Sequence, residues 1–294
     1  MGTILTAGET MAMITPRSAQ PVLDAQDFRM EAGGAESNVA VQAAAMGHRA
    51  RWFSRLGSDE LGFRILRQLS RSGVEVDHVV LDAERQTGLY VKSPGVGVSY
   101  YRRGSAASVL CADDLDLVPL ADADLVHLSG ITAALSESAL SFLETLIGRA
   151  HASRIPVSFD VNYRAPLWSA PEAAPVLQRL SASADIVFVG RDEAQILWGA
   201  ATVDEVRGLL PGVPELVVKD GSVGAWSTVG EETYFIPSRR VDVVEAVGAG
   251  DAFAGGYLSA LLDGAPIAER LLTGHDRAAL ALGTTADFTH ERTA

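Results

Sequence analysis

The chain has 294 residues, 48% of them hydrophobic, which is enough to bury the core of one large α/β domain. Its formal net charge of −13 argues against nucleic acid or an anionic membrane as a partner. One cysteine, Cys111, leaves no internal disulfide and fits a reducing, cytoplasmic location, and no apolar run of about 18 residues predicts a membrane span.

The predicted elements alternate between buried strands and helices. Residues 3–8 form the first predicted strand, and they lack the basic start and long apolar stretch of a signal peptide. Helices are expected at 35–46 and 60–72, which end near Gly47 and Gly73. Further strands are predicted at 124–128, 155–159, 185–189 and 215–218, and further helices at 136–150, 171–182, 192–198 and 203–209. Such alternation is typical of a parallel sheet with helices on both faces.

Two segments, 11–32 and 86–104, interrupt this alternation. Both contain Thr, Tyr, Val and Gly in short runs without a helical period, so we expect strands of a small accessory sheet. Ligands bind beyond the carboxyl ends of the strands in an open parallel sheet. A small sheet inserted there would act as a lid that excludes water. No internal repeat or linker is visible, so residues 1–294 are expected to form a single domain with this lid.

The run from Gly248 to Gly256, which reads GAGDAFAGG, is the most informative for function. Glycines let a backbone approach a phosphate closely, and the helix expected to follow would offer unpaired N–H groups to an anion. Asp251 would lie in the first helical turn, where a carboxylate can accept a proton from an attacking hydroxyl. The run therefore predicts phosphoryl transfer to an alcohol. The structural alternative is that Asp251 only stabilises the helix by its charge.

Two other nucleotide-binding motifs are absent. The dinucleotide fingerprint Gly-x-Gly-x-x-Gly would need glycine at the position of Phe253. A Walker loop needs Gly-Lys, and neither of the two lysines, Lys92 and Lys219, follows a glycine. A nicotinamide-dependent oxidoreductase on a similar sheet is thereby disfavoured.

Three motifs, in this order, resemble those of the ribokinase or PfkB-type sugar kinases. They are Gly33-Gly34-Ala35-Glu36-Ser37-Asn38-Val39-Ala40, Lys219-Asp220-Gly221-Ser222-Val223-Gly224-Ala225 and Gly248-Ala249-Gly250-Asp251. The resemblance covers nearly the whole chain. It implies a Rossmann-like α/β core with a small β lid, ATP with Mg²⁺ as the phosphoryl donor, and a sugar hydroxyl as the acceptor. It leaves the need for a monovalent cation open.

Within that family the chain is most similar to the kinases of 2-keto-3-deoxygluconate. Three segments carry this similarity: Thr87-Gly88-Leu89-Tyr90, Tyr100 to Ser108, and Asp160-Val161-Asn162-Tyr163-Arg164. Residues two apart on a strand face the same way, so Tyr100 and Arg102 would point together. A guanidinium fork suits a carboxylate, which favours a sugar acid over fructose or ribose. Alternatively, Tyr100 and Arg102 form a solvated strand face or a subunit interface, and Arg164 pairs with a surface acid.

The resemblance also implies a role for individual residues. Asp251 would take the proton of the 6-hydroxyl, while the backbone of Gly248, Ala249 and Gly250 stabilises the transferring phosphoryl group. The sugar acid would be bound by Gly34, Asn38, Tyr90, Tyr100, Arg102, Arg164 and Asp287. The nucleotide would be bound by Asn162, Lys219, Gly221, Ser222, Gly224 and His275, although His275 could equally be an ordinary helix-surface histidine. Glu193 would act on Mg²⁺ through water.

The chain departs from the family pattern in two places. The usual Asn-x-x-Glu motif, which is associated with Mg²⁺ and phosphate, reads Gly190-Arg191-Asp192-Glu193. The glycine lacks the amide that would help to hold the water molecules of the metal. The usual Asp-Thr before the glycines reads Glu245-Ala246, which questions a monovalent-cation site.

Two alternative functions stay open: a kinase of a neutral sugar, and a non-catalytic sugar-acid sensor. Lid sheets of this kind often pair between subunits, so a homo-oligomer is expected.

Overall fold

A mostly parallel sheet runs through the part of the chain that the computed structural model describes, residues 1–18, 20–243 and 247–283. Within these residues its nine strands lie in the order β15-β14-β13-β12-β11-β10-β1-β4-β6. Their bounds are β1 Thr3–Ala7, β4 Arg49–Phe53, β6 Val74–Glu75, β10 Leu125–Ser129, β11 Val157–Asp160, β12 Ile186–Gly190, β13 Glu215–Asp220, β14 Gly224–Val229 and β15 Glu232–Pro237. The strands from β6 across to β13 pair in parallel, whereas β14 and β15 are antiparallel at one edge.

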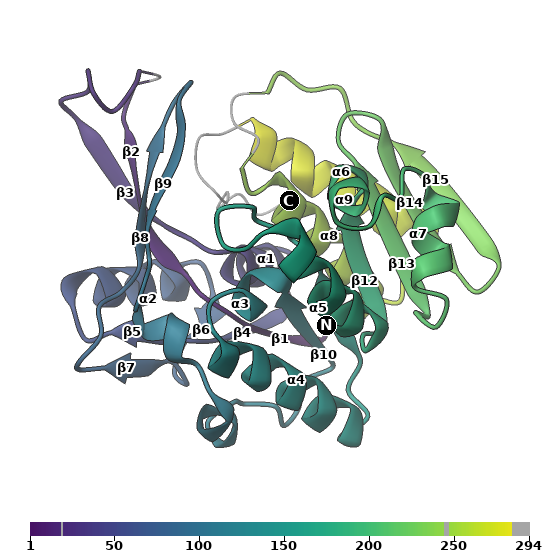
Figure 1. Cartoon of the computed structure of the whole chain (residues 1–294), viewed down its shortest axis with the longest axis horizontal. Coiled ribbons are helices and arrows are strands. Elements are labelled where there is room, and N and C mark those ends of the chain that lie inside the picture. Colours follow the sequence, from purple (N-terminus) through teal and green to yellow (C-terminus); the bar gives the residue numbers. More distant parts are fainter. Residues whose placement is uncertain (19, 244–246, 284–294) are drawn as a thin grey trace.

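Helices cover both faces of this sheet (Figure 1). The helices are α1 Ala35–Ala45, α2 Glu60–Arg71, α3 Gly130–Ala133, α4 Glu137–Ala152, α5 Ala170–Ala182, α6 Arg191–Trp198, α7 Val203–Leu209, α8 Ala249–Leu262 and α9 Ile267–Leu282. Helices α1, α2, α8 and α9 share one buried apolar cluster, and α3 to α7 share a second. Neighbouring strand residues supply opposite clusters: Ile4 and Phe188 belong to the first, while Leu5 and Val189 belong to the second. The period of two along a strand thus builds a separate core on each face.

The predicted strands and helices of the main sheet are confirmed to within a few residues, but four of its strands, β4, β6, β14 and β15, were not predicted. Strand β4 reads Arg-Ala-Arg-Trp-Phe, and its arginines conceal it from a search for apolar runs. Both arginines pair with Glu75 of the neighbouring strand β6. Strands β14 and β15 form an edge hairpin, in which β15 is largely exposed and therefore lacks an apolar signature.

The two segments that interrupt the alternation form a separate four-stranded sheet, as predicted. Its order is β3-β2-β8-β9, with bounds β2 Met11–Pro16, β3 Phe28–Gly33, β8 Leu89–Ser93 and β9 Gly97–Tyr101. Strand β2 pairs in parallel with β8, which joins the two distant segments into one unit. Figure 1 shows this small sheet projecting away from the main sheet.

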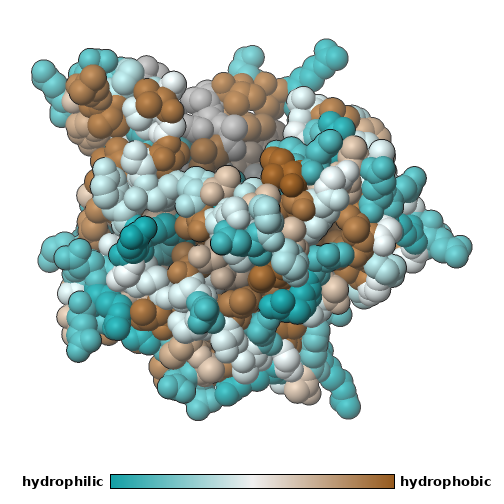
Figure 2. Space-filling model, viewed as in Figure 1, coloured by the Kyte–Doolittle hydropathy of each residue, from teal (hydrophilic) through white to brown (hydrophobic). Residues whose placement is uncertain are grey.

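Part of the small sheet's surface is apolar. Figure 2 shows hydrophobic residues gathered over it at the upper left of the molecule. Exposed large apolar side chains in its strands and turns include Leu23, Val96, Val98 and Tyr101. Separately, in the described residues no helix combines the length and the apolar character that crossing a membrane requires.

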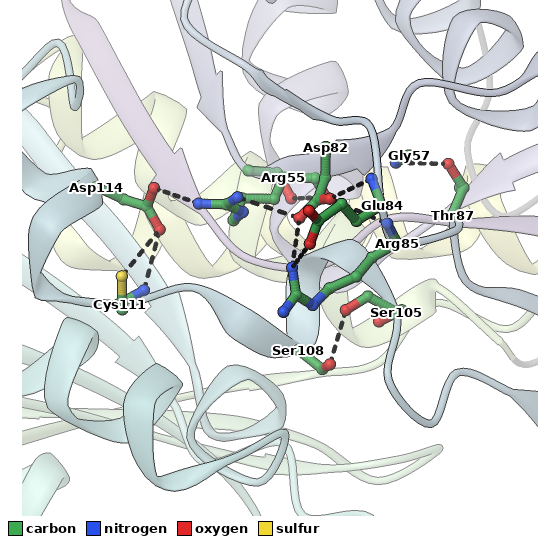
Figure 3. A network of polar contacts seen from close by, with 11 residues as sticks. Arg55, Gly57, Asp82, Glu84, Arg85, Thr87, Ser105, Ser108, Cys111 and Asp114 are labelled. Carbon is green, nitrogen blue, oxygen red and sulfur yellow. Dashed lines mark hydrogen bonds and ion pairs between the residues drawn. The ribbon is translucent and has the colours of Figure 1, made fainter.

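A network of polar and charged contacts lies beside the segment that leads into β8 (Figure 3). Arg55 lies in β5, Arg55–Gly57, which pairs with β7, Val80–Asp82. Its guanidinium donates to Asp82 at 3.1 Å and to Asp114 at 2.7 Å. The backbone N–H of Gly57 donates to Oγ1 of Thr87 at 3.0 Å, which fixes the chain before β8. The small sheet is therefore tied to the main body at its base by polar contacts.

Candidate active site

The N-terminus of α8 is formed by the glycine-rich run singled out in the sequence. Gly248 is the N-cap residue, with φ of 85° in the left-handed region that favours glycine. The first helical hydrogen bond runs from the N–H of Ala252 to the carbonyl of Gly248 at 2.9 Å. The N–H groups of Ala249, Gly250 and Asp251 precede that bond, so the helix does not satisfy them. They form the kind of helix N-terminus that stabilises negative charge.

Asp251 lies at this N-terminus and is held by two amides from other elements. Asn38 of α1 donates from Nδ2 to Oδ2 at 2.8 Å, and Asn162, just after β11, approaches Oδ1 at 3.4 Å. Asn162 has φ of 41°, a conformation that asparagine tolerates better than most residues. Burial raises the pKa of Asp251, although the hydrogen bond from Asn38 opposes the shift. A raised pKa makes this carboxylate a better proton acceptor.

A lysine and two carboxyl groups lie along the carboxyl ends of β11, β12 and β13. Lys219 donates from Nζ to Oδ2 of Asp160 at 2.6 Å. Burial opposes the charged amine, but the carboxylates of Asp160 and Glu193 raise the pKa of Lys219, so it stays an ammonium. Glu193 accepts from the N–H groups of Gly190 at 2.7 Å and Tyr163 at 2.8 Å, and burial raises its pKa.

These groups line a first cleft of about 590 Å³ between the small sheet and the ends of the main strands. The predicted substrate residues that line it are Gly34, Asn38, Tyr90, Tyr100, Arg102 and Arg164. Tyr100 and Arg102 face the same cleft as expected, although β9 ends at Tyr101 and Arg102 lies just beyond it. The Arg102 guanidinium lies 5.7 Å from the centre of the Tyr100 ring, and it forms an ion pair with Glu9.

A second cleft of about 530 Å³ contains the predicted nucleotide residues Lys219, Gly221, Ser222, Gly224 and His275. His275 is buried, contacts the carbonyl of Ile236 at 3.0 Å through Nε2, and packs against Phe253 with ring centres 5.1 Å apart. Burial lowers its pKa and favours the neutral ring. It is therefore not an ordinary surface histidine.

The two clefts meet at the start of α8, because Lys219, Gly221 and Gly250 line both of them. Asp251 lines only the first. Asn162, predicted to bind the nucleotide, also lines the first cleft and contacts Asp251, so its contact with a nucleotide stays a prediction.

The remaining predictions concern the late acidic residue, the monovalent-cation site and the metal. Asp287 and the pair Glu245-Ala246 lie outside the described residues. In the described part of the chain, no three His, Cys, Asp or Glu side chains are grouped to hold a metal ion. The contact of Glu193 with Mg²⁺ through water stays a prediction.

Sequence reasoning gave no role to three carboxyl groups that line the first cleft, Glu9, Asp160 and Asp192, nor to the buried Glu36. Glu9 comes shortly after β1, and Asp160 is the last residue of β11. Both therefore lie at the sheet edge where ligands bind, and this position was the sequence signal that could have identified them. Glu36 is fully buried in the first turn of α1, and its Oε1 accepts from Ser129 at 2.7 Å and Thr132 at 2.9 Å. Burial raises its pKa to about 7.

Comparison with known proteins places the chain in one family. Residues 1–291 match the family described as "pfkB family carbohydrate kinase". It is 34% identical to the 2-dehydro-3-deoxygluconokinase of Bacillus subtilis (strain 168), with 97% of this chain and 90% of that protein covered. It is 33% identical to the 2-dehydro-3-deoxygalactonokinase of Haloferax volcanii, with 94% and 90% covered. A crystal structure of a PfkB protein from Polaromonas sp. JS666 matches with a TM-score of 0.88 at 33% identity, with 96% of each chain covered. The chain therefore belongs to the pfkB family of carbohydrate kinases and is an ATP-dependent phosphotransferase.

Proposed function

We propose that this kinase transfers the γ-phosphoryl group of ATP to the 6-hydroxyl of 2-keto-3-deoxygluconate, also called 2-dehydro-3-deoxygluconate. The observation that carries the proposal is that the two clefts meet at the N-terminus of α8, where Asp251 lines the first cleft. A sugar acid in the first cleft and ATP in the second would bring an alcohol and a γ-phosphate to the same helix N-terminus.

In the proposed reaction the 6-hydroxyl oxygen forms a bond to the γ-phosphorus while the bond to the ADP oxygen breaks. Asp251 accepts the hydroxyl proton. The N–H groups of Ala249, Gly250 and Asp251 stabilise the charge on the phosphoryl oxygens, and they are oriented before the reaction begins. Mg²⁺ bound to ATP would neutralise phosphate charge, and Glu193 and Asp160 are the carboxyl groups that would hold its water molecules.

The choice of a sugar acid rests on two guanidinium groups in the first cleft, those of Arg102 and Arg164. A carboxylate binds a guanidinium through paired, charge-assisted hydrogen bonds, which a neutral hydroxyl does not replace. The Bacillus subtilis and Haloferax volcanii relatives are named as kinases of epimeric sugar acids, which supports this class of substrate.

A coupled ADP-release assay tests the proposal directly. Turnover of 2-keto-3-deoxygluconate, its galactonate epimer, fructose and ribose would be compared by kcat/KM. We expect both acids to exceed the neutral sugars by about tenfold or more, the discrimination typical of a charged hydrogen bond. Arg102→Met should raise KM for the acids about tenfold and leave KM for the neutral sugars nearly unchanged.

Equal or higher kcat/KM for fructose or ribose would instead support a neutral-sugar kinase. Binding of the acid by calorimetry without ATP turnover would support a sugar-acid sensor.

We also propose that the chain forms a homo-oligomer through its small sheet. The exposed apolar side chains there, including Val96 and Tyr101, support association, since such surfaces commonly mark interfaces. Tyr101 alternates with the cleft-facing Tyr100 on β9, so Tyr101→Asp should lower the mass measured by light scattering. An unchanged mass would contradict this interface.

A further inference from the structure

Glu9 is a carboxylate built into the wall of the first cleft. It lies between β1 and β2, lines the cleft, and is only 2% exposed. A buried carboxylate is costly unless charged or hydrogen-bonding partners compensate it. The space it occupies depends on Gly88, because a Cβ at that position would lie 2.9 Å from Oε1 of Glu9. The fold thus makes room for a carboxylate at a position where burying an apolar side chain would cost less free energy.

Both oxygens of Glu9 contact the segment that follows β9. Oε2 forms the ion pair with Nη2 of Arg102, and Oε1 accepts from Oγ of Ser105 at 2.6 Å. Ser105 lies three residues after Arg102, at the start of a short 3-10 turn in which its carbonyl accepts from Ser108 at 2.7 Å (Figure 3). Glu9 therefore ties the connection between β1 and β2 to the segment after β9 that carries the cleft-facing guanidinium.

The guanidinium of Arg102 is held from two sides. Glu9 binds one of its nitrogens, and the Tyr100 ring lies 5.7 Å from its central carbon. The Tyr100 ring in turn packs against Tyr90 at 5.8 Å between centres. The Arg102 side chain is only 10% exposed, so without Glu9 its charge would lose its nearest compensation and its orientation.

We infer that Glu9 is a positioning residue that orients Arg102 for the carboxylate of the substrate. This inference rests on the proposed function. A flexible arginine must be ordered when it binds, and ordering one such side chain costs roughly three- to tenfold in affinity. With Glu9 in place, that ordering is complete before the substrate arrives.

The test is the steady-state kinetics of Glu9→Gln with 2-keto-3-deoxygluconate and saturating ATP. We expect KM for the acid to rise roughly three- to tenfold and kcat to stay within twofold. Removing a negative charge beside an anionic substrate would by itself lower KM. A rise therefore reports lost positioning, and an unchanged or lower KM overturns the inference.

Glu31→Gln is the matched control. Glu31 also pairs with an arginine of the small sheet, Arg29 at 3.6 Å, but it does not line the cleft. Its substitution should leave both constants unchanged.

A double-mutant cycle separates positioning from a general structural effect. If Glu9 acts through Arg102, KM of the Glu9→Gln, Arg102→Met double variant should equal that of Arg102→Met alone within twofold. Multiplied effects would overturn the inference. If Arg102→Met leaves KM for the acid unchanged, the proposed role of Arg102 itself fails. A rise with Arg102→Met but none with Glu9→Gln removes only the role of Glu9.

Ser105→Ala keeps the test decisive if Glu9→Gln does not fold. It removes the hydrogen bond to Oε1 and leaves both charges in place. We expect a KM rise of about twofold to threefold with unchanged kcat, because one of the two contacts that orient Glu9 is lost. An unchanged KM in a folded Ser105→Ala protein counts against the inference.

Discussion

The two ends of the first cleft differ in whether their charged groups have charged partners. At the small sheet, the cation of Arg102 is already paired with the buried carboxylate of Glu9. At the N-terminus of α8, N–H groups lack helical partners, and the hydrogen bonds to the carboxyl of Asp251 come from the neutral amides of Asn38 and Asn162. The wall of the cleft that carries Glu9 and Arg102 thus has its charges paired before a substrate binds. The chemical end, which is the α8 N-terminus with Asp251, keeps N–H groups free of helical hydrogen bonds for the reacting groups. Substitutions at one end should therefore change KM, and those at the other should change kcat.

Asp251→Asn should break the chemical end with the largest effect. Asparagine keeps the size of the side chain but cannot accept the hydroxyl proton, so kcat should fall by about 10²- to 10⁴-fold. KM for the sugar acid should change little, because Arg102 and its partners are untouched. Steady-state kinetics with calorimetric ATP binding provide the measurement.

Asp263→Asn is the control, because Asp263 lies at the opposite end of α8, where it pairs with the chain N-terminus at 3.8 Å. It should retain normal turnover. Substantial activity in Asp251→Asn would remove Asp251 as the general base.

Glu36→Gln sharpens the comparison, because Glu36 is a buried carboxyl whose charge acts on Asp251, and burial raises its pKa to about 7. In the unfolded chain its pKa is 4.5, so the folded protein binds this proton more tightly. The resulting stability is fully present below about pH 4.5 and is lost as pH rises through about 7, a change of about 3 kcal/mol. Glutamine does not titrate.

The stability of Glu36→Gln relative to the parent protein should therefore rise by about 3 kcal/mol between pH 4.5 and pH 8. Urea unfolding at both pH values measures this difference. Glu137→Gln, an exposed first-turn residue of α4, should show no comparable pH dependence. A pH-independent difference for Glu36→Gln would contradict the raised pKa.

Gly248→Ala tests whether the geometry of the α8 N-terminus, and not only its carboxylate, sets kcat. Alanine in the left-handed region costs about 1 kcal/mol of stability. Gly264→Ala is a matched control, because Gly264 also has positive φ, 75°, and a Cβ there meets open space. Both variants should lose similar stability, measured by thermal unfolding. Only Gly248→Ala should also lose kcat, by about tenfold, because it moves the N–H groups that are proposed to bind the phosphoryl group. Equal kcat in both variants would contradict this.

Sequence patterns predicted the chemical end better than the wall, for a physical reason. A glycine run followed by an acidic first turn is a local signature, and the structure places Gly248 and Asp251 at the start of α8 as expected. Glu9 and Arg102 are far apart in the chain, and their pairing depends on how β2 and β8 meet, which no local pattern encodes. The same holds for the contact between Asn38 and Asp251. Strand β4 was missed because its arginines are satisfied by a glutamate on another strand.

Asp192 provides the prediction with the smallest effect. The resemblance to the sugar kinases expects an asparagine at Gly190, and a Cβ there would lie only 2.6 Å from Oδ1 of Asp192. The Asp192 carboxylate thus fills space that a side chain at 190 would enter, and it lines the first cleft. We expect it to replace the missing amide as a polar partner for the hydrated Mg²⁺.

Asp192→Ala should then raise the Mg²⁺ concentration for half-maximal rate by about threefold. This is less than the tenfold or more typical of residues that orient metal ligands, because Asp192 is exposed to solvent. Maximal kcat at saturating Mg²⁺ should be retained, since the carboxylate of Asp251 and the α8 N-terminus are unchanged. Asp204→Ala, which changes an exposed first-turn residue of α7 away from both clefts, should leave the Mg²⁺ dependence as it is. If the two titrations coincide, Asp192 does not replace the missing amide, and Glu193 and Asp160 remain the carboxyl groups proposed to hold the water molecules of Mg²⁺.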